Sequence, residues 1–381
     1  MAAAERQKAA SSFLKMVEIE GKGRGLVASQ PLKGGQIVMS DSPIYAYFAS
    51  PLKLRRSIEE CNSCCYTRCC AQCFRSLEAS EATTLTCPSC SHHEDAAFCS
   101  SKCQSLAFGS SHTPWVCRSL SYLRNCRLLV NHQTPEDRQI EARCLVAAFN
   151  LAMVFPSAFQ TFLSLDGCGA RDGQRYIDSA VFLHSLFSSI PLPEGFSLPS
   201  VEMTADILAK DWRNSFCLMD PFSEHKGRSV RAYALYLNAS FFNHSCLPNA
   251  CHFNYLDTTP HNGNTDLIIR VMHDIPQGEE ICISYLRVYL SYSERQRRLM
   301  TDYTFACSCN RCKVEATWSF EDGNETDHKG CDDSDFLHTY LKTFMCKREN
   351  CRGFLAPLPP SHDGNPSDCM ECNFCRELTK R

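Results

Sequence analysis

The sequence lacks a strong net charge, a long apolar run and an apolar N-terminal segment. The net charge is −3 over 381 residues and the pI is near 6.5, so no overall basic field indicates nucleic-acid binding. The most apolar stretch, 144–159, contains Asn150 and Pro156 and is shorter than the ~20 residues that cross a bilayer. Residues 1–10 lack the apolar core of a secretory signal. We therefore expect no membrane partner, and a location in the nucleus or the cytoplasm.

Two nucleotide-binding motifs and one metalloprotease motif are also missing. The glycine-rich segment 21–25 is neither a P-loop, because no G-x-x-x-x-G-K-[ST] is present, nor a dinucleotide fingerprint, because no long helix follows it. It reads as a hairpin turn between strands at 16–19 and 26–28, which with a strand at 36–39 predict a small antiparallel β unit. The sequence has no H-E-x-x-H motif either, so a zinc hydrolase is not indicated.

Cysteine, in contrast, is abundant, with 27 residues. In a reducing compartment such a number favours metal ligands and thiols over disulfides. Seven cysteines and one histidine with short spacings lie between residues 70 and 117, enough for two tetrahedral zinc sites. They are Cys70, Cys73, Cys87, Cys90, Cys99, Cys103, His112 and Cys117. The segment is poor in aliphatic residues, so metal binding would supply folding energy. Cys61, Cys64, Cys65 and Cys69 remain as surplus candidates.

Two more cysteine clusters follow towards the C-terminus. Cys307, Cys309 and Cys312 supply three ligands and lack a fourth. The last cluster has one cysteine more than a tetrahedral site needs; its expected ligands are Cys346, Cys351, Cys372 and Cys375, and the role of Cys369 stays open.

The rest of the chain reads as mixed helix and strand. Apolar periodicity predicts helices at 140–155, 180–190 and 201–209, the period changes from residue 230, and strands are predicted at 267–272 and 281–285. A charged helix is expected at 291–301 and a polar loop at 321–331. The short basic run 295–298 reads equally well as a solvated helix face or as a nuclear signal. Between these elements, residues 241–249 combine aromatic, amide, imidazole and thiol groups in one turn.

Several motifs occur together in order. They are the turn 21–25, the cysteine-rich insert, Asn243-His244-Ser245-Cys246-x-Pro248-Asn249, Gly278-Glu279-Glu280-x4-Tyr285 and Cys307-x-Cys309-x2-Cys312. The chain thereby resembles a short, plant-type form of the SET-and-MYND-domain protein-lysine methyltransferases. The resemblance implies an α+β fold, in which small antiparallel SET-type sheets carry a MYND zinc finger and a helical insert. The implied regions are the N-terminal SET part 14–60, MYND 61–120, helical insert 121–229, catalytic SET core 230–290, post-SET motif 291–315 and C-terminal zinc region 316–381.

The resemblance also implies residue roles. S-adenosylmethionine would be held by Lys22, Gly23, Arg24, Asn214, Asn243, His244, Tyr285 and Phe305. Tyr236, Phe216 and Tyr303 would line the lysine channel, with Tyr285 and Tyr236 as catalytic residues. Cys246 would complete the cluster at 307–312. In the MYND finger, Cys70, Cys73, Cys99 and Cys103 would bind one zinc ion, and Cys87, Cys90, His112 and Cys117 the other, for about four zinc ions in all.

The implied reaction is methyl transfer to a lysine amine by in-line displacement, which requires positioning and a neutral amine rather than metal chemistry. A narrow aromatic channel favours the neutral amine and tolerates the developing ammonium. The partner would be a protein with a target lysine, histone or not, and the enzyme is expected to be a monomer. The alternative hypothesis is an inactive MYND and SET scaffold that binds proline-rich peptides.

Overall fold

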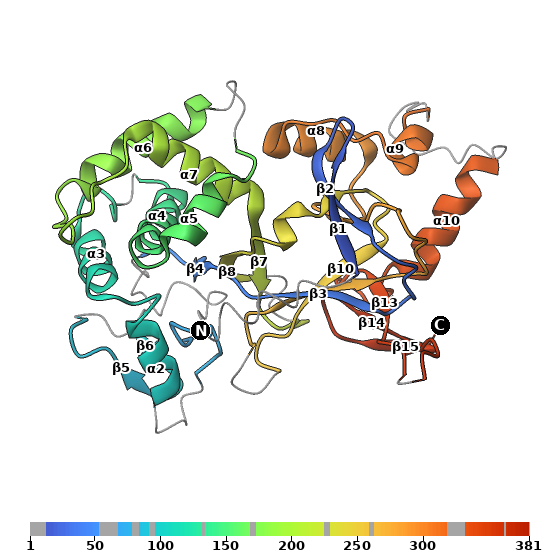
Figure 1. Ribbon diagram of the computed structural model, residues 1–381, viewed down its shortest axis with the longest axis horizontal. Helices are drawn as coiled ribbons and strands as arrows, with labels where there is room; N and C mark the ends of the chain where they lie inside the picture. Colours follow the sequence, from blue (N-terminus) through green and yellow to red (C-terminus); the bar gives the residue numbers. More distant parts are fainter. Residues whose placement is uncertain are drawn as a thin grey trace.

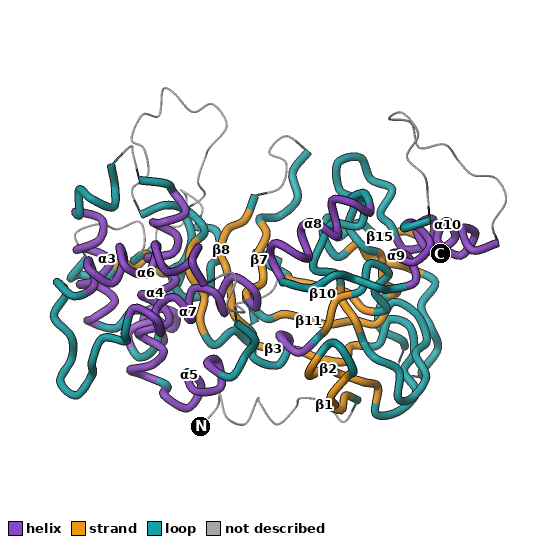
Figure 2. Tube along the Cα trace, turned by 90° about the horizontal axis from the view of Figure 1, so that it is seen from above, coloured by secondary structure: helices purple, strands orange, loops and turns teal. Residues whose placement is uncertain are grey.

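The computed structural model describes residues 13–52, 68–77, 84–90, 96–131, 134–167, 173–224, 229–258, 263–317, 332–361 and 363–380. Helices from the middle of the chain form one part of the molecule, and most of the strands form the other (Figure 1). Strands β7 (Ser215–Met219) and β8 (Val230–Leu235) lie between these two parts in both views (Figures 1 and 2). Among the residues described, no helix is long and apolar enough to cross a membrane.

The N-terminal strands belong to two different sheets. Strands β1 (Leu14–Ile19) and β2 (Gly23–Ala28) form the expected antiparallel hairpin, and Gly21 and Gly23 adopt positive φ in its turn. Strand β3 (Ile37–Asp41) instead pairs with β11 (Leu267–Val271), which pairs with β10 (Ala250–Asn254). The prediction of one local β unit is therefore wrong for the third strand, because its buried residues join a sheet made from the other end of the chain.

A second three-stranded sheet links the helices to the strands. Its order is β4 (Tyr45–Phe48), β8, β7, and the first two strands are separated in sequence by the cysteine-rich segment and the helices. Neither β4 nor β7 was expected from the sequence. Strand β4 is short and its partner β8 is distant, whereas β7 lies near β8 in the chain but directly follows helix α7 without a turn. The cysteine-rich segment itself forms a small unit with strands β5 (Leu85–Thr86) and β6 (Ala97–Phe98) and helix α2 (Ser101–Phe108).

The predicted helices are present, with longer bounds. The helical part contains α3 (Pro114–Asn125), α4 (Glu136–Val154), α5 (Pro156–Leu163), α6 (Gly173–Phe187) and α7 (Val201–Asn214). Phe149, Phe162 and Phe187 are almost fully buried at its centre. The break at Pro156 is confirmed, because this proline begins α5. Ser200 caps α7 by accepting from the Met203 N–H at 3.2 Å.

The C-terminal third completes the strand-rich part. Its elements are the short 3₁₀ helix η3 (Ala239–Phe241), β9 (Asn243–His244), β12 (Cys282–Ile283), α8 (Tyr292–Tyr303), α9 (Asn310–Glu315), α10 (Asp332–Phe344), β13 (Leu355–Pro357), β14 (Cys369–Cys372) and β15 (Leu378–Lys380). The sequence did not indicate α10 or the last three strands. The loop expected at 321–331 lies outside the described residues.

Candidate active site and zinc centres

The centre of the site is the parallel pairing of β9 with β12, which joins the turn at Asn243 to the strand before Tyr285. The strand predicted at 281–285 ends at Ile283, because the Tyr285 N–H donates to His244 Nδ1 at 3.0 Å instead of to a ladder carbonyl. Nδ1 is therefore an acceptor, and in the neutral ring the proton lies on Nε2. That nitrogen faces Cys246 Sγ at 3.3 Å, so the His244 side chain links Tyr285 to Cys246.

Tyr285 lies in a group of aromatic rings. Its hydroxyl donates to the Phe242 carbonyl at 2.7 Å, and burial raises the pKa of the phenol above its ordinary value. The Tyr303 ring lies 4.8 Å from the Tyr285 ring, and Phe305 lies 6.1 Å from His244, centroid to centroid. The three residues Tyr285, Tyr303 and Phe305 come together as the resemblance implies.

A polar cluster surrounds the Asn243 side chain on β9. The Asn243 amide donates to Glu280 Oε1 at 3.0 Å and to the Arg24 carbonyl at 3.3 Å. Lys22 pairs with the same carboxylate at 2.5 Å. Burial is the largest single influence on the pKa of Lys22 and lowers it, but the Glu280 hydrogen bond and the nearby negative charges together outweigh burial, and the net shift is upward. A Cβ at Gly25 would lie 2.6 Å from Asn243 Nδ2, so glycine is what lets the amide approach the strand.

A cavity of about 530 Å³ opens beside Tyr285. Asn214, Phe216, Phe242 and Tyr303 are among the residues that line it. Helix α7 and strand β7 meet at Ser215 and so deliver Asn214 and Phe216 to this wall. The Asn214 amide is used within the fold, since it donates to the carbonyls of Asp166 and Lys210 at 3.0 and 2.8 Å.

Tyr236 is the predicted site residue whose position differs most from the prediction. It is fully buried and is absent from the cavity lining. Its hydroxyl donates to the Thr265 carbonyl, and its ring meets Phe216 edge-on at 5.6 Å. Tyr236 therefore supports the Phe216 wall from behind in this structure, and its catalytic role stays a prediction.

Four sets of cysteine and histidine ligand atoms converge, each within 4.8 Å of one another. They are Cys70, Cys73, Cys99 and Cys103; Cys87, Cys90, His112 and Cys117; Cys246, Cys307, Cys309 and Cys312; and Cys346, Cys351, Cys372 and Cys375. Each set offers four mostly buried N or S donors, which is the donor set and number of a closed structural zinc site. Among the surplus cysteines, Cys69 and Cys369 belong to none of these sets, and Cys61, Cys64 and Cys65 lie outside the described residues.

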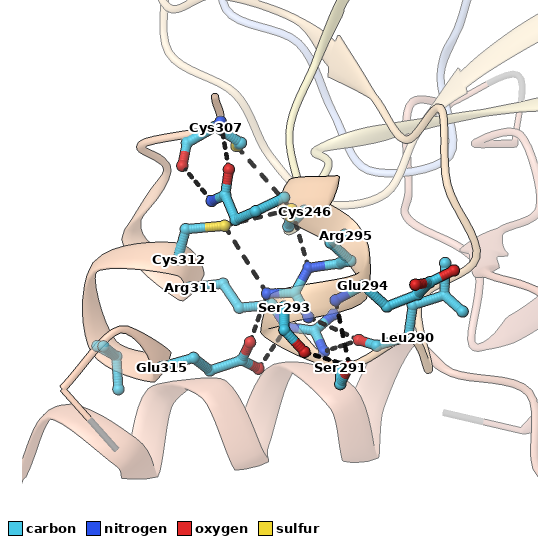
Figure 3. Close-up of polar contacts among 12 residues, drawn as sticks. Cys246, Leu290, Ser291, Ser293, Glu294, Arg295, Cys307, Arg311, Cys312 and Glu315 are labelled. Carbon is cyan, nitrogen blue, oxygen red and sulfur yellow. Dashed lines mark hydrogen bonds and ion pairs between the residues drawn. The ribbon is translucent and has the colours of Figure 1, made fainter. Parts of the chain in front are cut away.

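A buried arginine stands against the third set. Arg295 is 1% exposed; it donates through Nε to Cys246 Sγ at 3.2 Å, through Nη2 towards Cys312 Sγ at 3.7 Å, and also to Glu315 (Figure 3). Arg311 shares that carboxylate at 2.7 Å. The sequence missed Arg295 because the basic run 295–298 reads as a solvated face. That reading fits Arg298, which pairs with Glu294 at the surface, and is wrong for Arg295.

Known proteins with a SET domain are similar to this chain. The family model of the SET domain matches residues 23–286. The histone-lysine N-methyltransferase ASHR2 of Arabidopsis thaliana is 43% identical, covering 96% of this chain and 94% of that protein. Human histone-lysine N-methyltransferase SMYD3 is 25% identical over 77% of this chain, which spans only 60% of SMYD3.

One solved structure, the SET domain of LSMT bound to lysine and AdoHcy, covers 81% of this chain and 58% of that one, with a TM-score of 0.34 and 11% identity. That likeness is too distant to carry residue positions. The family match and the extent of the 43% identity confirm the predicted α+β SET fold. The chain belongs to the SET-domain family, in its SET-and-MYND group of protein-lysine methyltransferases.

Proposed function

We propose that this protein transfers the methyl group of S-adenosylmethionine to the side-chain amine of a lysine in a protein, histone or not. The position of Tyr285 carries the proposal. Its side chain lines the cavity, while its backbone is tied to His244 at the strand pair that borders the Lys22 and Asn243 cluster. A substrate amine in the cavity and a cofactor beside that cluster would meet at Tyr285.

The cofactor would lie against Lys22, Gly23, Arg24, Asn243, the His244 backbone and Phe305. These residues suit a zwitterionic nucleoside, since they combine a cation, amide and backbone groups and an aromatic ring. When bound, S-adenosylmethionine supplies an electrophilic methyl group on a sulfonium. The Asn214 amide is already bonded to two carbonyls, so its contribution would be to hold the cavity wall.

The lysine would enter between Phe216 and the rings of Tyr285 and Tyr303. These half-buried rings exclude water from the amine, which favours its neutral form. They also accept the positive charge that develops on nitrogen, by cation–π attraction of about 1–2 kcal/mol. The Tyr285 hydroxyl, held by the Phe242 carbonyl, is the polar group that would orient the amine.

We further propose that the four cysteine sets each bind one structural zinc ion. The Cys246 set would help to shape the active site, because it joins the turn after β9 to the segment that carries Tyr303 and Phe305. We place the protein in the nucleus or the cytoplasm, where these thiols stay reduced.

The test uses the zinc-loaded full chain. Calorimetry should show binding of S-adenosylmethionine, and labelled cofactor should transfer methyl groups to lysines in histones or in a cell extract. Replacing Tyr285 by phenylalanine should reduce turnover while leaving the fold intact. A protein that binds no cofactor in the presence of zinc would contradict the proposal.

A scaffold function is the second candidate, favoured by the surface of the MYND module. On α2, Leu106 is 52% exposed and Phe108 is 40% exposed, an apolar pair of the kind that proline-rich peptides contact. A peptide pull-down with Leu106→Ser, set beside the methylation assay, distinguishes the two functions. Binding without any methyl transfer would favour the scaffold.

A further inference from the structure

The C-terminal cysteine module, defined as residues 346–380, forms part of the wall of the cavity at Tyr285. Asn373 fixes the module there, since its side chain accepts from the Phe354 N–H at 2.8 Å and donates to the His252 carbonyl on β10 at 3.2 Å. Phe374 packs edge-on against Phe222 at 5.7 Å. The module is therefore within reach of a substrate segment that occupies the cavity beyond the target lysine.

The charged side chains of the cavity are nearly all cationic. They are Arg213, Arg287, Arg352, Arg376 and Asp220. The carboxylate of Asp220 pairs with Arg231 at 2.7 Å, and Arg231 also pairs with Asp257 at 2.9 Å, so Asp220 is only partly compensated and the four arginines still outnumber it. Burial and the charge of Arg376 lower the pKa of His252 to about 4, so this histidine stays neutral at pH 7.

Two of these arginines belong to the module, and neither forms an ion pair within the described part of the chain. Arg352 is exposed, and its guanidinium lies over the Tyr289 ring at 4.8 Å. Arg376 stacks on Tyr255 at 4.4 Å, and its Nη2 donates to the Asn254 carbonyl. Its Nη1 is buried with no hydrogen-bond partner among the described residues. Arg352 therefore keeps donors that an anion could use, and Arg376 adds positive charge to the same wall.

The backbone places both arginines at cysteine turns. Arg352 and Arg376 directly follow Cys351 and Cys375, and both adopt left-handed φ, at 50° and 64°, as Phe74 does after Cys73. A left-handed residue with a Cβ costs about 1–2 kcal/mol, and glycine is the default at such positions. The two turns of the module thus hold arginines at the cavity wall where glycine would fit with less strain.

We infer that Arg352, together with the positive charge of Arg376 in the same wall, selects substrates in which an acidic side chain lies close to the target lysine. A guanidinium binds a carboxylate through paired hydrogen bonds. The cavity volume suits a short peptide segment, and its cationic lining disfavours a lysine flanked by further basic residues. The same positive charge lowers the pKa of the incoming lysine, which helps to supply the neutral amine. This inference rests on the proposed methyltransferase function.

The experiment measures methyl transfer by the zinc-loaded full chain to peptides with one central lysine. The three positions on each side are scanned with Glu, with Gln and with Arg, and a phosphoserine series separates carboxylate from phosphate recognition. We expect Glu to raise kcat/KM roughly tenfold over Gln at one or two positions, and Arg to lower it.

Matched variants assign the effect. Arg352→Gly should abolish the preference for Glu while the midpoint of thermal unfolding does not fall, since it removes the charge and the left-handed strain together. Arg352→Lys should keep part of the preference. Arg348→Gln is the control: Arg348 lies in the same module, pairs with Glu224 at 2.8 Å and does not line the cavity. It should leave the preference unchanged.

The outcomes separate this inference from the proposed function. Equal turnover of Glu, Gln and Arg peptides, a preference for phosphoserine alone, or an unchanged preference in Arg352→Gly would overturn the inference and leave the methyltransferase intact. Fluorescence anisotropy of labelled Glu and Gln peptides measures binding in parallel. Absence of both cofactor binding and methyl transfer would refute the proposed function, and equal binding of the two peptides would then refute the inference as well.

Discussion

Arg295→Met is the substitution whose effect follows most directly from the structure. The guanidinium is 1% exposed, and its removal takes away hydrogen bonds to Cys246 Sγ at 3.2 Å, to the Leu290 carbonyl at 2.6 Å and to Glu315. Breaking a buried ion pair from one side costs about 3–5 kcal/mol. Arg311 still pairs with Glu315 at 2.7 Å, so the carboxylate keeps one partner. We therefore expect about 3 kcal/mol, the lower end of that range.

The same change should weaken zinc retention at the Cys246 set, because four thiolates on one divalent ion leave negative charge that the arginine offsets. The assay follows urea unfolding together with zinc release into a chromogenic chelator, for Arg295→Met and for Arg298→Met. Arg298 lies on the same helix at the surface, and its loss should change neither quantity. If the two variants unfolded at the same urea concentration and released zinc equally, the reasoning about the buried guanidinium would be wrong.

Three other changes give expectations of the same kind. Tyr285→Phe removes a hydroxyl that is hydrogen-bonded to the Phe242 carbonyl. Turnover should fall at least tenfold, which corresponds to the loss of one polar contact of about 1.4 kcal/mol, while the circular dichroism spectrum stays unchanged. Unaltered turnover would show that Tyr285 is not catalytic. Cys246→Ser should cost one zinc ion and most activity together, read by elemental analysis and methyl transfer; losing only one of them would separate the two functions of the turn. Burial, and to a smaller extent the charge of Arg376, lower the pKa of His252 to about 4 in the folded protein. In the unfolded chain this histidine is protonated below about pH 6.5. Its contribution to the free energy of unfolding is therefore fully present above pH 6.5 and is lost as the pH falls towards 4. The thermal midpoint of His252→Asn should therefore fall less between pH 7 and 5 than that of the parent, and parallel curves would contradict this.

Local pattern was sufficient for the helical part and for the grouping of cysteines. Helices α4 and α7 carry apolar residues at helical spacing, with a proline or a serine cap marking their limits, and such signals act within a few residues. Cysteine pairs at short spacing likewise indicate metal ligands without any tertiary information. The spacing alone could not say which pairs share an ion, and that assignment came from the family resemblance.

Strand pairing was much harder to predict. Strand β3 pairs with β11 across more than half of the chain, and β4 pairs with β8 across almost half of it, so neither pairing can be predicted from neighbouring residues. The same holds for Arg295: its charge resembles that of Arg298 in sequence, and only the packing of α8 against α9 and the Cys246 turn buries one and exposes the other.

The amino-acid sequence by itself indicated the family and grouped most of the sixteen predicted metal ligands, because motifs and cysteine pairs depend on residue type and spacing. Cys246 and the aromatic residues of the site were implied by the resemblance to that family. Only the tertiary structure decided that Tyr236 turns its hydroxyl to Thr265, that His244 joins Tyr285 to Cys246, and that the C-terminal module brings Arg352 and Arg376 to the cavity beside Tyr285. Each of these depends on contacts between segments distant in the chain, whose geometry is set by how the sheets and the cysteine turns pack together.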